Sequence, residues 1–209
     1  HFLSEDLENY TNEHTDNEPL LLQELSKRTH LSVLQPRMIS GHLQGRFLSL
    51  LSKLVQPKVI LEIGTYTGYA TLCLAEGLST NGVLHTIDIK EELIDLQREF
   101  FDRSGYGNQI VQHLGKAADI IPTLNTTFDL VFIDADKQNY SLYFDLVIEK
   151  MNRGGIILSD NVLWSGNVVE EVKHNDKHTQ ALMIYNQKLK DDSRVETVLF
   201  PIRDGITVS

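Results

Sequence analysis

The sequence predicts an α/β domain built on a doubly wound, mostly parallel sheet with helices on both faces. From residue 59 onward, short apolar runs rich in β-branched residues alternate with segments of helical periodicity, as in consecutive β-α-β units. Polar residues directly follow several of the apolar runs, and α/β proteins bind ligands at the carboxyl ends of their strands. The last two predicted strands are joined by a connection too short for a parallel crossover. One strand of the sheet is therefore expected to be antiparallel.

The elements follow in order along the chain. We expect two helices before residue 35 and a longer helix over 40–55, where Leu and Phe recur three and four positions apart. Arg153-Gly154-Gly155 is predicted to be a turn. We expect these elements to form one domain over residues 1–209, with residues 1–37 as an N-terminal helical lid or interface segment. The seven expected strands are 59–63, 83–88, 109–114, 128–133, 156–159, 195–201 and 206–209, and the later helices are 67–78, 91–103, 117–124, 139–151 and 178–190.

Composition restricts the partners. The chain of 209 residues has a formal net charge of -10, and an acidic surface repels phosphate backbones and anionic lipid, so nucleic acid and membrane are not expected partners. No apolar run approaches the ~20 residues that span a bilayer. The single cysteine, Cys73, excludes an internal disulfide. A cytoplasmic location is the default expectation.

The first candidate site follows the strand over 59–63. Glu62, Gly64 and Gly68 form the spacing E-x-G-x-x-x-G in a strand-turn-helix context, where glycines let the backbone approach a ligand. This spacing differs from the dinucleotide fingerprint, because a carboxylate stands two residues before Gly64. A carboxylate suits a cationic or hydroxyl-bearing ligand. The alternative is a plain turn whose glycines serve geometry alone.

The second candidate is Asp88, which ends the strand over 83–88. An acidic residue about 20 positions after a glycine turn commonly holds the ribose hydroxyls of an adenosine. The alternative is an N-cap for the helix that follows. Together with the glycine turn, the position of Asp88 favours ribose binding.

The third candidate combines the ends of two strands. Asp134 follows the strand over 128–133, and Asp160 and Asn161 follow the strand over 156–159. These strands are expected to be neighbours, so their three side chains are expected to meet. Oxygen ligands favour Mg²⁺, with Ca²⁺ or Mn²⁺ also possible, and not zinc. The alternative is independent capping of the two following segments.

Two other functions fit parts of this pattern. A phosphatase of the haloacid dehalogenase type also uses D-x-D after a strand together with Mg²⁺. Its pair normally follows the first strand, whereas Asp134 and Asp136 follow the fourth, and Gln138 stands where Thr or Val is usual. A non-catalytic cofactor-binding module is the other alternative.

With these motifs placed, the chain resembles the cation-dependent class I O-methyltransferases, a family that includes caffeoyl-CoA O-methyltransferase, its bacterial relatives and, more distantly, catechol O-methyltransferase. The stretches that carry the resemblance are 62–69, 132–140, 160–166 and 204–207. It implies a Rossmann-like seven-stranded sheet with one antiparallel strand, S-adenosylmethionine as cofactor, a divalent cation and a homodimer. The implied reaction transfers a methyl group to one hydroxyl of a catechol-like aromatic small molecule.

The resemblance also assigns residues. Lys137 matches the general base of catechol methylation, with Asp134 beside it, and Lys137, Trp164 and Ser165 match substrate-contacting positions. Asp134, Asp160 and Asn161 match the metal ligands. Two departures from plant members, Ser165 in place of Asn and residues 42–46 in place of Ala-Asp-Glu-Gly-Gln, count against a coenzyme A ester. The positions matched to cofactor binding are Met38, Ser40, Glu62, Gly64, Thr65, Gly68, Ala70 (where the family often has a hydroxyl residue), Asp88, Ala117, Asp134 and Asp136.

Overall fold

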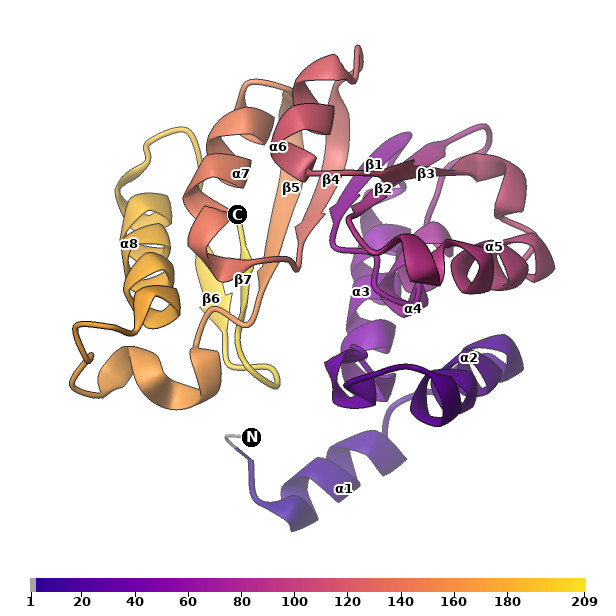
Figure 1. Ribbon diagram of the computed structural model, residues 1–209, viewed down its shortest axis with the longest axis horizontal. Coiled ribbons are helices and arrows are strands. Elements are labelled where there is room, and N and C mark those ends of the chain that lie inside the picture. The colour runs from indigo at the N-terminus through magenta and orange to yellow at the C-terminus, as the bar shows by residue number, and fades with distance from the viewer. Residues whose placement is uncertain (1–2) are drawn as a thin grey trace.

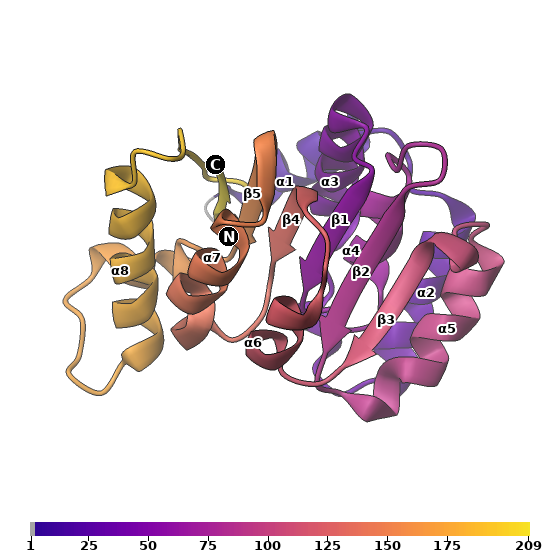
Figure 2. The ribbon, with the colours of Figure 1, turned by 90° about the horizontal axis from the view of Figure 1, so that it is seen from above.

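A computed structural model describes residues 3–209, so residues 1 and 2 of the predicted lid segment lie outside the described residues. It contains a seven-stranded sheet in the order β3-β2-β1-β4-β5-β7-β6 (Figures 1 and 2). The chain starts at the centre, moves to one edge and returns to build the other, which confirms the doubly wound α/β prediction. The strands are β1 Val59–Ile63, β2 Val83–Asp88, β3 Ile110–Leu114, β4 Phe128–Ile133, β5 Met151–Asp160, β6 Val198–Phe200 and β7 Ile206–Val208.

The terminal strands give the sheet its single reversed member. β7 pairs antiparallel with both β5 and β6, whereas β1 to β5 pair in parallel. The hairpin from β6 to β7 is therefore the predicted antiparallel connection. β6 is shorter than the predicted strand over 195–201, and it forms an edge of the sheet.

Helices cover both faces of the sheet (Figure 2). Side chains of α2 to α5 pack on one face, and side chains of α6 to α8 pack on the other. Successive strand residues alternate between the two layers, since Ile60 belongs to the first cluster and Leu61 to the second. The helices are α1 Glu5–Glu13, α2 Leu20–Ser32, α3 His42–Val55, α4 Tyr69–Ala75, α5 Ile94–Arg103, α6 Ala117–Ile120, α7 Tyr140–Ile148 and α8 Lys177–Asp191.

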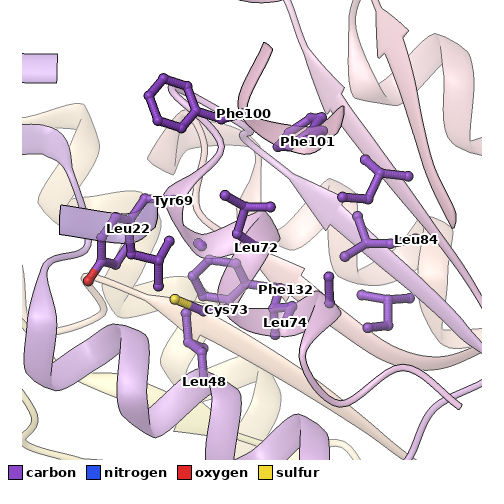
Figure 3. Close-up of a cluster of buried hydrophobic side chains, with 14 of the residues drawn as sticks. Leu22, Leu48, Tyr69, Leu72, Cys73, Leu74, Leu84, Phe100, Phe101 and Phe132 are labelled. Carbon is purple, nitrogen blue, oxygen red and sulfur yellow. The ribbon is translucent and has the colours of Figure 1, made fainter. Parts of the chain in front are cut away.

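The first cluster joins the N-terminal helices to the sheet. Figure 3 shows Leu22 of α2, Leu48 of α3 and Cys73 of α4 together in one apolar layer. Cys73 is fully buried, and burial raises the pKa of its thiol to about 12. A protonated, buried thiol is a packing group and a poor nucleophile.

Helix α3 packs through a face other than the one that its large residues suggest. Its buried side includes Gly45, Ser49 and Ser52, whereas Leu50 and Leu54 are exposed. A Cβ on Gly45 would stand 2.7 Å from the Tyr69 ring. Small residues therefore let α3 approach α4 closely, while Leu50 and Leu54, from the row where Leu and Phe recur, are turned outward.

The predicted turn at 153–155 lies inside β5 instead. Phe128 pairs with Met151, but Leu130 pairs with Ile156, so the register shifts within the β4–β5 ladder. Gly154 takes φ +82° inside this irregular segment. The strand is long because it begins before the shift and resumes after it.

No helix among residues 3–209 is long and apolar enough to cross a membrane.

Candidate functional site

The candidate site lies at the carboxyl edge of the central strands. Ile63 of β1 pairs with Ile133 of β4, and Ile133 pairs in turn with Ser159 of β5. The next residue of each strand is therefore at the same level, which places Gly64, Asp134 and Asp160 in one row. This register therefore brings together three candidate site residues that lie far apart in the sequence.

Gly64 is required by the close approach of two strand ends. The Gly64 N–H donates to the Ile87 carbonyl at 2.9 Å, and the Asp134 N–H donates to the Ile63 carbonyl at 2.9 Å. Gly64 has φ +102°, and a Cβ there would lie 2.0 Å from the Asp134 carbonyl oxygen. No side chain fits, so the β1 and β4 tips meet directly beside the pocket.

A small pocket opens at this row of residues. Six of the residues predicted to bind cofactor line it, and Ile39, Tyr66 and Tyr69 complete its wall. Tyr66 and Tyr69 also contact the N-terminal segment. The Tyr66 hydroxyl donates to the Leu34 carbonyl at 3.3 Å, and the Tyr69 hydroxyl donates to the Glu18 carboxylate. Residues before α3 therefore close one side of the pocket. The six predicted lining residues are Met38, Ser40, Gly64, Thr65, Ala70 and Asp134.

Glu62 is the most deeply buried acid of the site. Its Oε2 accepts from the Thr71 hydroxyl and from the Thr86 hydroxyl at 2.5 Å, while Oε1 has no hydrogen-bond partner. Thr86 in turn lies 2.5 Å from the Thr65 hydroxyl. Burial raises the pKa of Glu62 to about 8, against the opposing effect of the two threonine hydrogen bonds. One oxygen of the Glu62 carboxyl group is therefore buried without a hydrogen-bond partner, two residues before the pocket residue Gly64.

Asp88 and Ala117 lie along the same edge, at the ends of β2 and β3. The Asp88 carboxylate accepts the Tyr66 N–H at 2.7 Å and the Lys90 N–H at 3.0 Å. The second bond is a local turn contact and not a helix cap, since the helical turn over Glu91–Leu93 has Lys90 at its N-cap and no side-chain capping bond. A carboxylate has about four acceptor sites, so two remain open for further donors. Ala117 begins α6 just after β3, and Gly68 precedes α4 with φ +89°.

Asp134, Asn161 and Lys137 form a compact charged group. The Lys137 ammonium donates to Asp134 Oδ1 at 3.1 Å, to Asn161 Oδ1 at 2.7 Å and to the Tyr140 hydroxyl at 2.6 Å. Asn161 takes φ +59°, a conformation that Asn tolerates better than most residues. The side chain of Lys137 is buried. Its three N–H groups are therefore all used within the candidate metal and substrate site.

Asp160 completes the group from the tip of β5. Its Oδ1 accepts the Asn161 N–H at 2.7 Å, and its Oδ2 accepts Gln44 Nε2 at 2.5 Å. Burial raises the pKa of Asp160 to about 7, the nearby Asp134 adds to this, and the Lys137 charge opposes it. A buried acid beside a second carboxyl group, as Asp160 is, ionises less readily unless a cation lies nearby.

The donor set fits a hard divalent cation. Among residues 3–209, no three His, Cys, Asp or Glu side chains form a metal-holding group, so the set depends on the Asn161 amide beside Asp134 and Asp160. Carboxylate and amide oxygens are ligands of Mg²⁺, Mn²⁺ and Ca²⁺. The Lys137 ammonium already rests on two of these three residues, which shows that this group of oxygens accommodates positive charge.

The remaining predicted residues are placed differently. The exposed Asp136 carboxylate accepts from Asn139 and from the Tyr143 hydroxyl, which ties it to α7. Trp164 lies with its ring centroid 6.0 Å from the Lys137 Nζ and 5.9 Å from the His178 ring. The exposed Ser165 N–H donates to Asp204 Oδ1 at 2.5 Å. Trp164 is therefore beside the charged group, while Asp136 is held by its own helix.

Three residues of this site were not predicted from the sequence. The Tyr140 hydroxyl donates to the Asp160 carbonyl at 2.9 Å while it accepts from Lys137. Gln44 binds Asp160, and Arg203 binds Gln44. Tyr140 stands inside the 132–140 motif, so its position carried a usable signal. Gln44 lies in the 42–46 stretch and Arg203 directly before the 204–207 motif, but nothing in the sequence paired either residue with Asp160.

Comparison with known proteins agrees with this geometry. A family model described as O-methyltransferase matches residues 12–209. Caffeoyl-CoA O-methyltransferase of Petroselinum crispum is 33% identical over 176 residues, which are 79% of this chain and 73% of that protein. The chain therefore belongs to the S-adenosylmethionine-dependent O-methyltransferase family. This placement overrides the phosphatase alternative that D-x-D suggested.

Solved structures extend the agreement to the whole fold. The O-methyltransferase from Bacillus cereus, solved with SAH, superposes with a TM-score of 0.89 at 28% identity and covers 97% of this chain and 96% of its own. The O-methyltransferase TomG from Streptomyces achromogenes, solved with SAM, gives 0.88 at 29% identity, covering 97% and 94%. The seven-stranded fold and the enzyme class are thus shared with these proteins.

Proposed function

We propose that the protein transfers a methyl group from S-adenosylmethionine to one hydroxyl of a catechol-like aromatic, with a divalent cation, most readily Mg²⁺, held by Asp134, Asp160 and Asn161. The observation that supports this most directly is the position of Asp134. It lines the small pocket and is also hydrogen-bonded to Lys137 in the charged group. A cofactor in the pocket and a substrate at the charged group would therefore be neighbours.

The proposed reaction needs a phenolate, because a free phenol has a pKa near ~10 and is mostly protonated at neutral pH. A divalent cation, when bound, would hold both vicinal oxygens and lower that pKa. Lys137 makes three hydrogen bonds as an ammonium. It would accept the phenol proton at Nζ as the neutral amine, in which a lone pair replaces one of these N–H groups beside the Trp164 ring.

The residues around this point also control water and orientation. Methyl transfer joins an anion to a cation, so its barrier depends on the solvation of both. Trp164 and His178 form an aromatic wall on one side, and Tyr66 and Tyr69 face the N-terminal segment on the other. We infer that residues before α3 act as the lid over the cofactor and that the aromatic wall holds the acceptor ring.

The decisive experiment removes one proposed metal ligand. Asp160→Ala is expected to abolish turnover of a catechol, while S-adenosylmethionine binding remains measurable by calorimetry. EDTA is expected to stop the wild-type enzyme, and Mg²⁺ or Mn²⁺ is expected to restore it. Catechol turnover that survives both EDTA and Asp160→Ala would show that the metal role is wrong.

We further propose that the protein is a homodimer. The outer face of α3 exposes Leu50 and Leu54, and the edge strand β6 exposes Val198, Leu199 and Phe200. Phe47 of α3 lies 6.3 Å from Phe200 between ring centroids, so these two surfaces adjoin. An exposed apolar edge strand is normally covered in native proteins. A cytoplasmic location stays a prediction.

A further inference from the structure

The structure assigns Arg203 and Gln44 a role in positioning the proposed metal ligand Asp160. The two residues form a hydrogen-bond relay from the β6–β7 turn to the tip of β5. Arg203 Nη1 donates to Gln44 Oε1 at 3.2 Å, and Gln44 Nε2 donates to Asp160 Oδ2 at 2.5 Å. This inference rests on the proposed function, because it concerns how one ligand of the proposed cation is held.

The relay fixes the direction of the Gln44 amide. A glutamine side chain can place either its oxygen or its nitrogen toward a neighbour, but a guanidinium only donates. Arg203 therefore binds the oxygen of Gln44 and leaves the nitrogen for Asp160. Gln44 is fully buried, so no bulk water replaces either contact. The Asp160 carboxylate also selects the nitrogen because it only accepts, so without Arg203 the amide would lose one of the two partners that fix its orientation.

The relay also completes the set of hydrogen bonds on the Asp160 carboxylate. One oxygen accepts the Asn161 N–H at 2.7 Å and the other accepts Gln44 Nε2. The terminal torsion of an aspartate is otherwise broad, so a carboxylate with one donor is free to rotate. With a donor on each oxygen, Asp160 keeps one orientation and presents its remaining lone pairs to the site.

Arg203 adopts a backbone conformation that is unusual for a residue other than glycine. It has φ +50°, in the left-handed region that a residue with a side chain rarely adopts. Its Nη1 also donates to the Ile39 carbonyl at 3.3 Å, between the pocket residues Met38 and Ser40. The following residue, Asp204, accepts the Ser165 N–H. The turn therefore links the pocket wall, the metal-ligand strand and the substrate loop.

The test measures binding of Mn²⁺ alone, by calorimetry on cofactor-free protein. Gln44→Met keeps the length of the side chain but removes the donor, and it is expected to weaken Mn²⁺ about 10- to 100-fold. Arg203→Met is expected to weaken Mn²⁺ about 3- to 10-fold in the wild-type background and to have almost no further effect in Gln44→Met, because both act through one relay. Arg203→Lys keeps a charged donor and is expected to restore most of the affinity.

Controls separate positioning from folding. Arg153→Met removes an exposed arginine at the opposite end of β5 and is expected to leave Mn²⁺ affinity unchanged. S-adenosylmethionine affinity of Gln44→Met is expected to stay within about 3-fold of wild type, since the relay acts on the metal ligand. Thermal unfolding checks that each variant is folded. If Gln44→Met does not fold, weakening in Arg203→Met with recovery in Arg203→Lys supports the relay.

Three results would overturn the relay. The first is a folded Gln44→Met variant that binds Mn²⁺ as tightly as wild type. The second is an equal loss of Mn²⁺ affinity when Arg203→Met is made in wild type and in Gln44→Met. The third applies if Gln44→Met does not fold, and it is an Arg203→Met variant that binds Mn²⁺ as tightly as wild type. A wild-type protein that binds no Mn²⁺ is a different failure. It would remove the metal from the proposed function as well as the relay that depends on it.

Discussion

Glu62 gives a prediction that links the site to stability. Its side chain is fully buried at the end of β1, and burial raises its pKa from 4.5 to about 8. Between these values the folded protein binds a proton that the unfolded chain releases. Stability is therefore highest below the unfolded pKa and falls as pH rises through the folded pKa. The neutral variant Glu62→Gln removes this dependence.

The size of the effect follows from the same values. Each pH unit between the two pKa values changes the free energy of unfolding by about 1.4 kcal/mol. Raising the pH from about 5 to about 8 therefore lowers the free energy of unfolding by at most about 4 kcal/mol. Relaxation of the protein around the charged group lowers the cost of ionising the buried Glu62. We therefore expect an actual loss of about 2 kcal/mol in the free energy of unfolding. For a chain of this length, that corresponds to a difference of roughly 6 °C in Tm.

The assay compares the thermal unfolding of wild type and Glu62→Gln at about pH 5 and at about pH 8, both without cofactor. Other titrating groups, including Asp160, affect both proteins and largely cancel in the difference. We expect the wild type to lose about 6 °C more than the variant between the lower and the higher pH. Parallel pH profiles for the two proteins would show that Glu62 is not held neutral by burial, and the argument would fail.

Two further predictions concern the base and the assembly. Lys137→Ala is expected to lower kcat about 10²- to 10⁴-fold with Mn²⁺ binding retained. An unchanged pH–rate profile in Lys137→Ala would remove Lys137 from the role of base. Phe200→Glu places a charge on the exposed edge strand and is expected to convert a dimeric wild type into a monomer, as measured by light scattering. A wild type that is already monomeric would contradict the proposed dimer.

The sheet was predictable because its signals are local. Each central strand is a short, mainly apolar run that ends beside a polar or glycine residue, as with Ile133 before Asp134. Parallel neighbours then bring such ends together, which is why Asp134, Asp160 and Asn161 were predicted to meet. The Arg153-Gly154-Gly155 stretch was read as a turn, since glycine pairs mark both turns and strand irregularities.

What the sequence did not reveal depends on distant partners. Gln44 and Asp160 are separated by 116 positions, and Gln44 and Arg203 by 159, so no spacing rule connects them. The buried face of α3 was not evident from the sequence either, because Gly45 and Ser49 carry no hydrophobic signal. Their value lies in the close approach that they permit, which only the position of α4 makes visible.

The contact at Gly64 restricts how this enzyme can be engineered. A Cβ at this position would overlap the Asp134 carbonyl, so a library that varies residue 64 would consist almost wholly of misfolded protein. Selectivity for a new acceptor is better sought in the loop that carries Ser165, whose exposed side chain leaves room for exchange. Natural divergence is expected to follow the same division, with an inflexible junction of strands and a rim open to variation.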